Sequence, residues 1–199
     1  MTETAPERPG LRERKKARTR AAIQEQALRL FRERGYDATT VEQIADAAEV
    51  SPSTFFRYFG SKEDVVIYDY LDPIMIEAWN AQPKELGPVQ AMRRAMVQVF
   101  AGLTPEQVED MNERARLIYA VPELRTAMID DLIRTSAMLA EEVGARSGRP
   151  ADDFRVRAFT GALIGAIMAA ILPALNDSAP DYVALIDEVF QYFEDGLPL

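Results

Sequence analysis

The sequence predicts an all-α protein, and three observations support this. Apolar residues recur at helical spacing along most of the chain, residues that favour helix starts stand before these runs, and no segment of any length alternates as a β-strand does. The chain has 199 residues, of which 48% are hydrophobic, so it can form one or two compact domains with a sizeable core. We expect a flexible basic arm over residues 1–17, a three-helix domain over residues 18–64 and a larger helical domain over residues 65–199.

The N-terminal segment is polar and then strongly basic. It opens with MTETAPERPG, which lacks the apolar core of a secretory signal and is expected to be mobile. Between Arg8 and Arg34, ten basic residues face three acidic ones, a local charge of +7 in a chain whose net charge is −9. Contacts to nucleic-acid phosphates require such a positive excess, because binding is driven largely by counterion release. The stretch Arg12–Arg20 is then either an arm that reaches DNA or the solvated start of a helix.

The segment Thr39–Lys62 predicts two short helices separated by a tight turn. At the start of the first helix, Thr39 with Glu42 or Thr40 with Gln43 can form a capping box, and the sequence leaves both frames open. One apolar face follows at helical spacing, formed by Val41, Ile44, Ala45 and Ala48.

The second helix of the pair has a clear start. Ser51 is a good N-cap, and Pro52 suits the first helical position, where its missing N–H has no partner in any case. Phe55 and Phe59 are four residues apart and face inward with Val50, and Gly60 is expected to supply the left-handed residue that ends the helix. The other faces carry Ser53, Thr54, Phe56, Arg57 and Tyr58. A helical pair of this size has little use as an enzyme core, but it can insert one helix into the major groove of DNA.

From about Arg18 to Lys62 the sequence resembles the DNA-binding domain of the tetracycline-repressor (TetR) family of bacterial regulators. The resemblance rests on LFRERGYDATTVEQIA followed by AAEVSPSTFFRYFGSKEDV, whose pieces stand in order with the family's spacing. It implies that the rest of the chain is helical, dimeric and effector-binding. By position, it also implies phosphate contacts from Thr40 and Ser51, base-edge contacts from Ser53, Thr54 and Arg57, and backbone contacts from Tyr58 and Lys62.

Two residues depart from the family pattern. Phe56 stands where a tyrosine is common, so its ring offers DNA an apolar contact, such as one with a thymine methyl group, in place of a hydroxyl. Glu49 stands where a glycine is common in the turn, which leaves the backbone conformation of the turn open.

Beyond this pair the chain reads as helices throughout. Ser61 caps a long helix that is interrupted near Asp72-Pro73 and ends around Trp79, and a breaker-rich linker follows it. Further helices are expected over residues 88–101, from a cap at Thr104 to about residue 119, from Pro122 to about residue 146, across the apolar segment 158–176, and over residues 182–194.

The uncharged segment 158–176 is at the short limit for crossing a bilayer, and we favour burial in protein because charged helices surround it. Its small residues allow close approach of a second helix. With the final helix and the two-fold copies of both, they would form a four-helix dimer interface, as the family resemblance implies; packing within one chain is the alternative. The residues expected at this interface are Gly161, Ala162, Gly165, Ala166, Ala169 and Ala170 on one helix and Val183, Ile186, Val189, Phe190 and Phe193 on the other.

A ligand site is expected in the C-terminal domain. Leaving aside Met1, all seven methionines lie beyond the helix pair, and methionine adapts to apolar ligands as readily as it fills gaps in a core. We expect an apolar or amphipathic effector; fatty acyl-coenzyme A or a hydrophobic drug-like compound is suggested by the resemblance alone. The candidate ligand-binding residues are Met75, Trp79, Met96, Phe100, Tyr119, Met138 and Phe159.

The composition excludes several classes of function. The chain has no cysteine and no histidine, so it lacks thiol chemistry, the commonest general base and the usual zinc ligands, and we expect no metal and no cofactor. It also lacks a glycine-rich phosphate loop and any recognisable nucleophile motif, which argues against an enzyme. We therefore predict a cytoplasmic, nucleoid-associated homodimer that represses from a near-palindromic operator in double-stranded DNA and is released by its effector. Activation in place of repression, and a helical adaptor that binds other proteins, are the alternatives.

Overall fold

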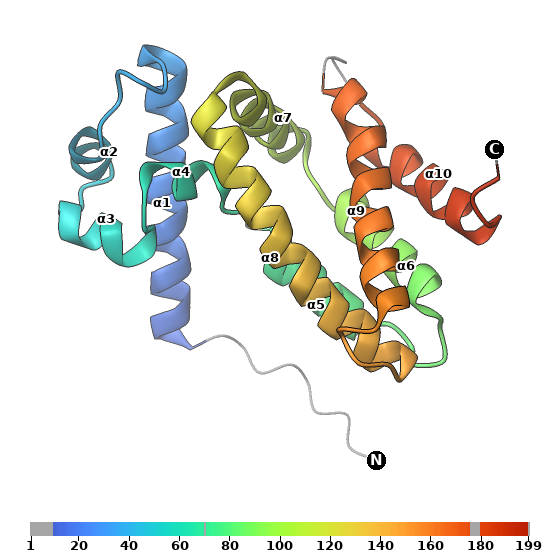
Figure 1. The fold of residues 1–199 in the computed structure, drawn as a ribbon. Helices are drawn as coiled ribbons and strands as arrows, with labels where there is room; N and C mark the ends of the chain where they lie inside the picture. The colour runs from blue at the N-terminus through green and yellow to red at the C-terminus, as the bar shows by residue number, and fades with distance from the viewer. Residues whose placement is uncertain (1–9, 70, 176–179, 199) are drawn as a thin grey trace. The chain divides into compact units, whose positions relative to one another are not determined.

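The computed structural model describes residues 10–69, 71–175 and 180–198, which form ten α-helices and no strand (Figure 1). The all-α fold predicted from the sequence is confirmed. The chain divides between Tyr68 and Asp69 into two compact units, each with its own core.

The N-terminal unit contains α1 (Leu11–Arg34), α2 (Val41–Ala47), α3 (Pro52–Tyr58) and α4 (Lys62–Ile67). It extends beyond the expected limit at residue 64 because α4 packs on α1 and buries two valines. The residues that fill its core are Ile23, Ala27, Leu30, Phe31, Tyr36, Ile44, Ala45, Phe55, Phe59, Val65 and Val66.

Helix α1 begins earlier than the sequence predicts. Residues 11–17, expected to belong to a flexible arm, form its first two turns, while residues 1–9 lie outside the described residues. The physical reason is that LRERKKAR consists almost entirely of strong helix formers and lacks any glycine or proline. Helix formation therefore continues outward from the packed part of α1.

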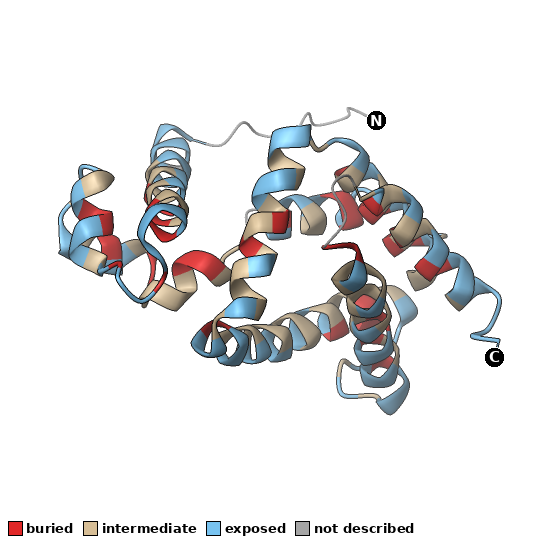
Figure 2. Cartoon of the chain, turned by 90° about the horizontal axis from the view of Figure 1, so that it is seen from above, coloured by how far each residue is buried: buried red, intermediate tan, exposed pale blue. Residues whose placement is uncertain are grey.

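The C-terminal unit contains α5 (Leu71–Asn80), α6 (Pro88–Ala101), α7 (Pro105–Ala120), α8 (Pro122–Ser147), α9 (Phe154–Ala174) and α10 (Tyr182–Glu194). Helix α6 packs between α5 and α10, and α9 packs on both α8 and α10. Buried residues form narrow stripes along these helices, and much of each helix surface stays exposed or half-buried (Figure 2).

The single long helix expected from Lys62 to about Trp79 is instead two helices. Helix α4 ends at Ile67 and α5 begins at Leu71, so the break lies several residues before Asp72-Pro73. The side chain of Asp69 accepts a hydrogen bond from the Leu71 amide at 2.9 Å, which starts a new helix. Pro73 is then harmless, because the first turn of a helix has no backbone acceptor for its missing N–H.

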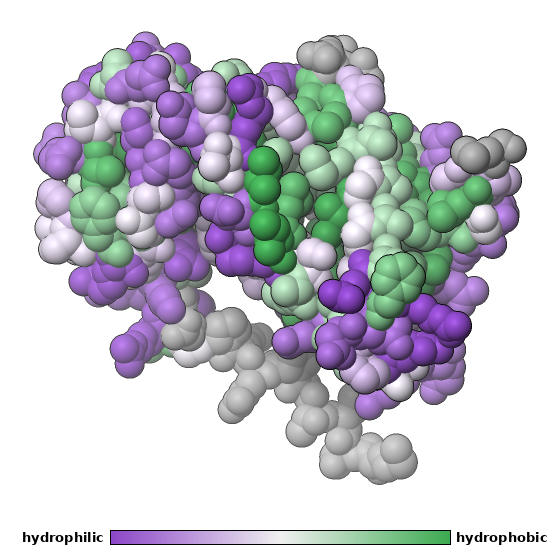
Figure 3. Space-filling view, viewed as in Figure 1, coloured by the Kyte–Doolittle hydropathy of each residue, from purple (hydrophilic) through white to green (hydrophobic). Residues whose placement is uncertain are grey.

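The apolar helix α9 is less buried than expected. It is long and apolar enough to cross a membrane by length and composition, yet only 17% of its most apolar 18-residue window is buried within the chain. Gly161, Ala162, Gly165 and Ala169 are all exposed. Apolar side chains gather on the surface over α9 and α10 (Figure 3). Packing within this chain therefore does not account for the composition of α9.

Candidate nucleic-acid interface

The helix pair begins at a cap that the sequence left undecided between Thr39 and Thr40. Thr40 is the N-cap of α2, and its capping box is complete: the Gln43 amide donates to Thr40 Oγ1 at 3.3 Å and the Thr40 amide donates to Gln43 Oε1 at 3.0 Å. Thr39 is buried, and its hydroxyl donates to the Gly35 carbonyl at 2.9 Å. Thr40 is thus at the surface, while Thr39 holds the turn after α1.

The turn between α2 and α3 places Glu49 in the left-handed region, at φ 54°. An L-residue pays about 1–2 kcal/mol in that conformation, and glycine does not. The turn therefore keeps the backbone conformation for which glycine is suited, although glycine is absent.

Different capping residues define the start and the end of helix α3. Ser51 is its N-cap and accepts a hydrogen bond from the Thr54 amide at 3.1 Å, with Pro52 at the first helical position. At the other end, the prediction that Gly60 ends the helix in a left-handed conformation is wrong. Phe59 caps the helix in extended conformation and is buried, so the chain leaves the helix one residue before the glycine.

The exposed face of α3 carries chemistry suited to DNA. Ser53, Phe56 and Arg57 are exposed, whereas Phe55 on the opposite side is fully buried. Phe56 keeps 53% of its surface accessible, which is high for a phenylalanine on a short helix. Arginine can bind guanine through two hydrogen bonds, serine can bind several base edges, and an aromatic ring can contact a thymine methyl group.

Hydroxyl groups and the guanidinium lie close together on this surface. Ser51 Oγ lies 2.9 Å from both Ser53 Oγ and Thr54 Oγ1, and Arg57 Nη2 donates to Thr54 Oγ1 at 3.4 Å. The Arg57 guanidinium also lies 5.5 Å from the ring centre of half-buried Tyr58. These weak local contacts hold Arg57 over the surface of α3 without neutralising its charge.

Lys62 is placed differently from the other predicted DNA contacts. It is half-buried, and its ammonium donates to the carbonyls of Tyr36 at 3.0 Å and Thr39 at 3.2 Å while lying 4.0 Å from the Tyr36 ring centre. The Tyr36 hydroxyl in turn donates to Glu63 Oε1 at 2.7 Å. In this structure Lys62 ties the start of α4 to the loop after α1.

Two polar residues of α1 that sequence reasoning missed lock α3 and α4 in place. Arg20 Nη2 donates to the carbonyl of Tyr58 at 3.3 Å, and its guanidinium lies 4.6 Å from the ring centre of Tyr68 and 5.6 Å from that of Phe59. Gln24 is buried and donates to the carbonyls of Val65 at 2.9 Å and Tyr68 at 2.8 Å. The i, i+4 spacing of Arg20 and Gln24 was visible in the sequence, but nothing there indicated that they face inward.

The predicted ligand-binding residues of the C-terminal unit fall into two groups. Trp79 and Met96 belong to its hydrophobic core, and Met75, Phe100 and Phe159 pack against that core. Tyr119 is half-buried on α7 and Met138 is exposed on α8. Five of the seven expected residues thus belong to, or pack against, one hydrophobic core.

Trp79 already has structural partners. Its indole N–H donates to Glu142 Oε2 at 3.1 Å, and the Arg146 guanidinium lies 4.4 Å from the centre of its ring. Arg146 also donates to the Trp79 carbonyl at 3.2 Å and the Pro83 carbonyl at 2.8 Å, which closes the end of α5. These contacts join α5 to α8.

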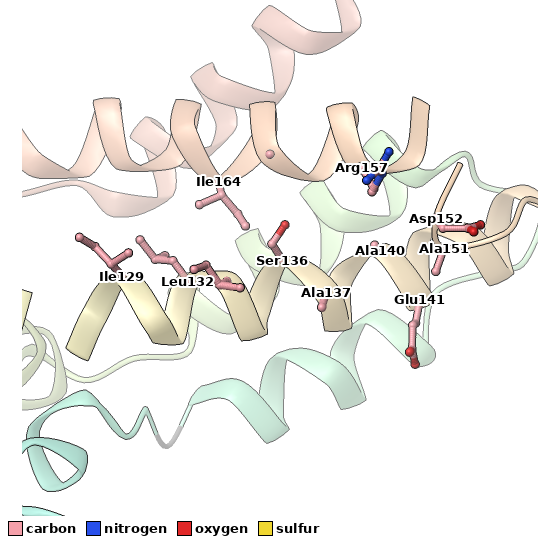
Figure 4. Close-up of a pocket in the computed structure, with 12 residues that line it drawn as sticks. Ile129, Leu132, Ser136, Ala137, Ala140, Glu141, Ala151, Asp152, Arg157 and Ile164 are labelled. Carbon is pink, nitrogen blue, oxygen red and sulfur yellow. The ribbon is translucent and has the colours of Figure 1, made fainter. Parts of the chain in front are cut away.

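A groove of about 630 Å³ lies between α8 and α9, and none of the expected ligand residues lines it. Ile129 and Leu132 line it from α8, and Ile164 points toward them from α9, with Arg157 at the other end (Figure 4). Ile129 and the neighbouring Ile133 are more than half exposed. In the sequence, only the i, i+4 spacing of Ile129 and Ile133, with Leu132 between them, indicated this apolar lining.

A second groove, of about 800 Å³, lies between α9 and α10. It is lined by small residues of α9 and by a mixed face of α10, comprising Ala166, Ala169, Ala170, Ala184, Leu185, Asp187, Glu188, Val189, Gln191, Tyr192 and Asp195. The expected interface residues Ile186, Val189 and Phe190 of α10 are instead buried in the core of their own unit. They stabilise one chain, and Val189 also lines the groove, whereas Ile186 and Phe190 do not.

Comparison with known proteins agrees with this architecture. Residues 23–68 match the family described as bacterial regulatory proteins of the tetR family, and residues 86–198 match the MftR C-terminal domain. The HTH-type transcriptional regulator TcmR of Streptomyces glaucescens is 37% identical over 164 residues, which cover 78% of this chain and 73% of TcmR.

Solved structures of low sequence identity share the fold. The regulator FadR of Bacillus subtilis, in complex with stearoyl-CoA, superposes with a TM-score of 0.58 at 22% identity, covering 89% of this chain and 99% of that chain. The repressor FadR of Thermus thermophilus, in complex with lauroyl-CoA, gives a TM-score of 0.57 at 21% identity over 90% and 95% of the two chains. With the helix pair, its exposed α3 face and these matches in view, this chain belongs to the TetR family of DNA-binding transcriptional regulators, which are not enzymes.

Proposed function

We propose that this regulator is a cytoplasmic homodimeric repressor whose α3 helix reads a near-palindromic operator and which an amphipathic acyl compound releases. One observation supports the reading role most strongly: Ser53, Phe56 and Arg57 share the exposed side of a helix whose other side is buried. Ser51, Thr54 and Tyr58 belong to the same helix and its cap, Thr40 is exposed at the start of α2, and Lys62 ties the start of α4 to the loop after α1.

Specificity would come mainly from Arg57, which supplies the positive charge and paired donors that guanine recognition needs. Phe56 would favour a thymine methyl next to it. A single α3 makes few base contacts, so tight binding requires two copies on successive major-groove faces, about 34–36 Å apart.

The decisive experiment compares Arg57→Ala with wild type on an operator selected from fragments of the host genome. We expect a loss of about 1–3 kcal/mol, or about 5- to 150-fold in Kd, on the operator and relaxed preference at one base pair. Arg134→Ala, which removes an exposed arginine of α8, is the matched control and should bind as wild type does. Wild-type protein that binds no selected duplex, or Arg57→Ala binding as tightly as wild type, contradicts the proposal.

The homodimer is supported by the exposed small residues of α9. A Cβ added at Gly161 or Gly165 would meet no atom within 4 Å, so packing within the chain does not require either glycine. Close approach by a second helix does explain them, and the groove between α9 and α10 beside them is open to receive one. A two-fold copy would cover this apolar surface.

An acyl-coenzyme A effector is supported by the core of the C-terminal unit and by the ligands of two structural neighbours. The FadR proteins above were solved with stearoyl-CoA and lauroyl-CoA. In this chain Met75, Met92, Met96 and Met111 lie in or against one core, and flexible thioether side chains can repack around an inserted alkyl chain.

Release would follow from a change in the spacing of the two α3 helices. The two units are joined through Tyr68 and Asp69. Tyr68 is held by Arg20 and Gln24, and Arg20 also bonds to the Tyr58 carbonyl at the end of α3. An effector that binds one arrangement of the C-terminal units better than another shifts the dimer toward it, in proportion to its differential affinity.

A further inference from the structure

We propose that the first two turns of α1 form a second DNA contact, which binds the phosphate backbone beside the groove that α3 enters. This contact, the basic stem, comprises residues 11–18 and acts through Arg12, Arg14, Lys15, Lys16 and Arg18. The inference rests on the proposed function but assigns a site outside the helix pair.

All five cations of the basic stem are exposed, and none of the α1 residues before Ile23 whose burial is described is buried. No described side chain forms an ion pair with any of the five, although the protein as a whole is acidic, with a net charge of −9. The stem is therefore a helical segment that buries little surface of its own chain and concentrates positive charge.

The position of these charges within α1 is unfavourable for the isolated helix. The N-terminal end of a helix carries a partial positive charge, which favours acidic residues and disfavours basic ones. Gly10 caps α1 without a side-chain hydrogen bond, and Glu13 is the single acidic residue of the stem against five basic ones, which leaves a net charge of +4. A polyanion beside the first turns would offset the repulsion between this charge and the helix dipole.

The basic stem extends beyond the end of α3. Arg20 Nη2 donates to the Tyr58 carbonyl at the end of α3, which fixes where α1 passes that helix. Leu11 lies nine residues further out, or about 13.5 Å along the axis at about 1.5 Å per residue. Figure 1 shows the N-terminal turns of α1 extending past α3. The length of this extension is comparable to the width of a B-DNA major groove, about 12 Å.

Contacts of this kind read no bases. The five cationic side chains of the basic stem would neutralise phosphates and release counterions irrespective of sequence. Its contribution is thus the same on operator and on mixed-sequence DNA, and it decreases with salt. Arg57 differs, because its loss affects the operator most.

The test uses the full chain and a fluorescein-labelled 30-base-pair duplex of mixed sequence, titrated at KCl concentrations between 50 and 200 mM. The stem variant is Arg14→Gln/Lys15→Gln/Arg18→Gln. The matched control is Arg94→Gln/Arg134→Gln/Arg155→Gln, three exposed arginines of the C-terminal unit, and it changes the net charge by the same amount.

We expect the slope of log K against log[KCl] to become shallower by about 0.9 for every phosphate contact that the stem variant loses. Affinity at 50 mM KCl should fall about tenfold or more, whereas the control should keep the wild-type slope. Amide hydrogen exchange of residues 11–18 should slow when duplex is added to wild type.

Equal slopes for the stem variant and the control overturn the basic stem and leave the proposed function intact. Wild-type protein that binds neither this duplex nor an operator overturns both. Thermal unfolding midpoints close to wild type, expected because the substituted side chains are exposed, exclude a folding defect as the cause of weaker binding.

Discussion

Glu49 shows how one residue in this protein combines strain with a role in the DNA-reading domain. It lies at φ 54° in the turn that sets the angle between α2 and α3, and its side chain is exposed. An exposed glutamate with positive φ gains no packing that offsets the strain, since its side chain is in water. The turn is kept by its neighbours: the Val50 amide donates to the Ala45 carbonyl at 2.9 Å and Ser51 caps α3.

Replacing Glu49 by glycine should stabilise the protein. The substitution relieves about 1–2 kcal/mol of backbone strain and loses about 0.4–1 kcal/mol through the greater freedom of the unfolded chain, for a net gain of about 0.5–1 kcal/mol. Thermal unfolding of Glu49→Gly and Glu49→Ala provides the check. Alanine retains the strain, so only glycine should raise the midpoint, and a lowered midpoint for glycine contradicts this account.

At the level of elements, α1 is the support on which α3 and α4 are mounted. Arg20 and Gln24, one turn apart, reach the C-terminal ends of α3 and α4 through backbone carbonyls, and Thr39 and Lys62 fix the loop between α1 and α2. The carbonyls at a helix end lack partners within the helix, so side-chain donors are effective there. The orientation of α3 therefore depends on α1 more than on the short helix itself.

Loss of Arg20 should reduce recognition without removing a phosphate contact. In Arg20→Gln the cation no longer lies against the rings of Tyr68 and Phe59, and α3 is less firmly held. We expect the ratio of operator affinity to mixed-sequence affinity to fall about tenfold, with an unchanged salt slope on mixed-sequence DNA.

The control for this variant is Arg18→Gln, which removes an exposed cation two residues away. Arg18→Gln should alter the salt slope and leave the ratio of the two affinities nearly constant. If Arg20→Gln changes the slope as Arg18→Gln does, Arg20 binds phosphate directly and its positioning role is wrong.

At the level of the whole molecule, the proposed assembly depends on the surface of α9 and α10. Exposed Gly161, Gly165 and Ala169 and the groove beside them leave an apolar surface that a second copy would bury. Arg93 on α6 holds α10 in place, since it bonds to Asp187 at 2.8 Å and to Glu194 at 2.7 Å. The hydrogen bond from Arg93 lowers the pKa of Asp187 and keeps this link ionised at neutral pH.

A large charged side chain on α9 should dissociate the dimer. Ala169→Arg places a guanidinium in the groove between α9 and α10, and burial of an unpaired charge at the interface is strongly unfavourable. Sedimentation analysis at micromolar concentration should show a monomer with little operator binding. Ala145→Arg, at an exposed position of α8, should remain dimeric. A monomeric wild type would rule out the two-fold model.

Effector binding should depend on the core of the C-terminal unit. Met96→Trp fills the space around a buried methionine, and we expect it to lose the thermal shift and operator release that stearoyl-CoA produces in wild type. Met138→Trp changes an exposed residue and should respond as wild type does. No response of wild type to stearoyl-CoA or lauroyl-CoA would exclude this ligand class while leaving DNA binding untouched.

The sequence alone determined most of the helices of this protein and the chemistry of the exposed face of α3. Caps such as Ser51-Pro52 and Thr104-Pro105 act within a few residues, so their outcome depends on local hydrogen bonds that the sequence specifies directly. The spacing of Phe55 and Phe59 predicted which side of α3 faces inward. The same spacing predicted that Ser53 and Arg57 face outward.

Only the tertiary structure decided which polar residues face inward and which apolar ones do not. Arg20 and Arg18 look alike in a basic run, but one lies against Tyr68 and the other is in water. Ile186 and Phe190 are buried within their own chain, whereas Gly165 and Ala169 of the apolar helix are exposed. These differences depend on contacts between residues that are far apart in the chain, such as Arg20 with Tyr58 and α6 with α10, and periodicity within one helix carries no information about its neighbours.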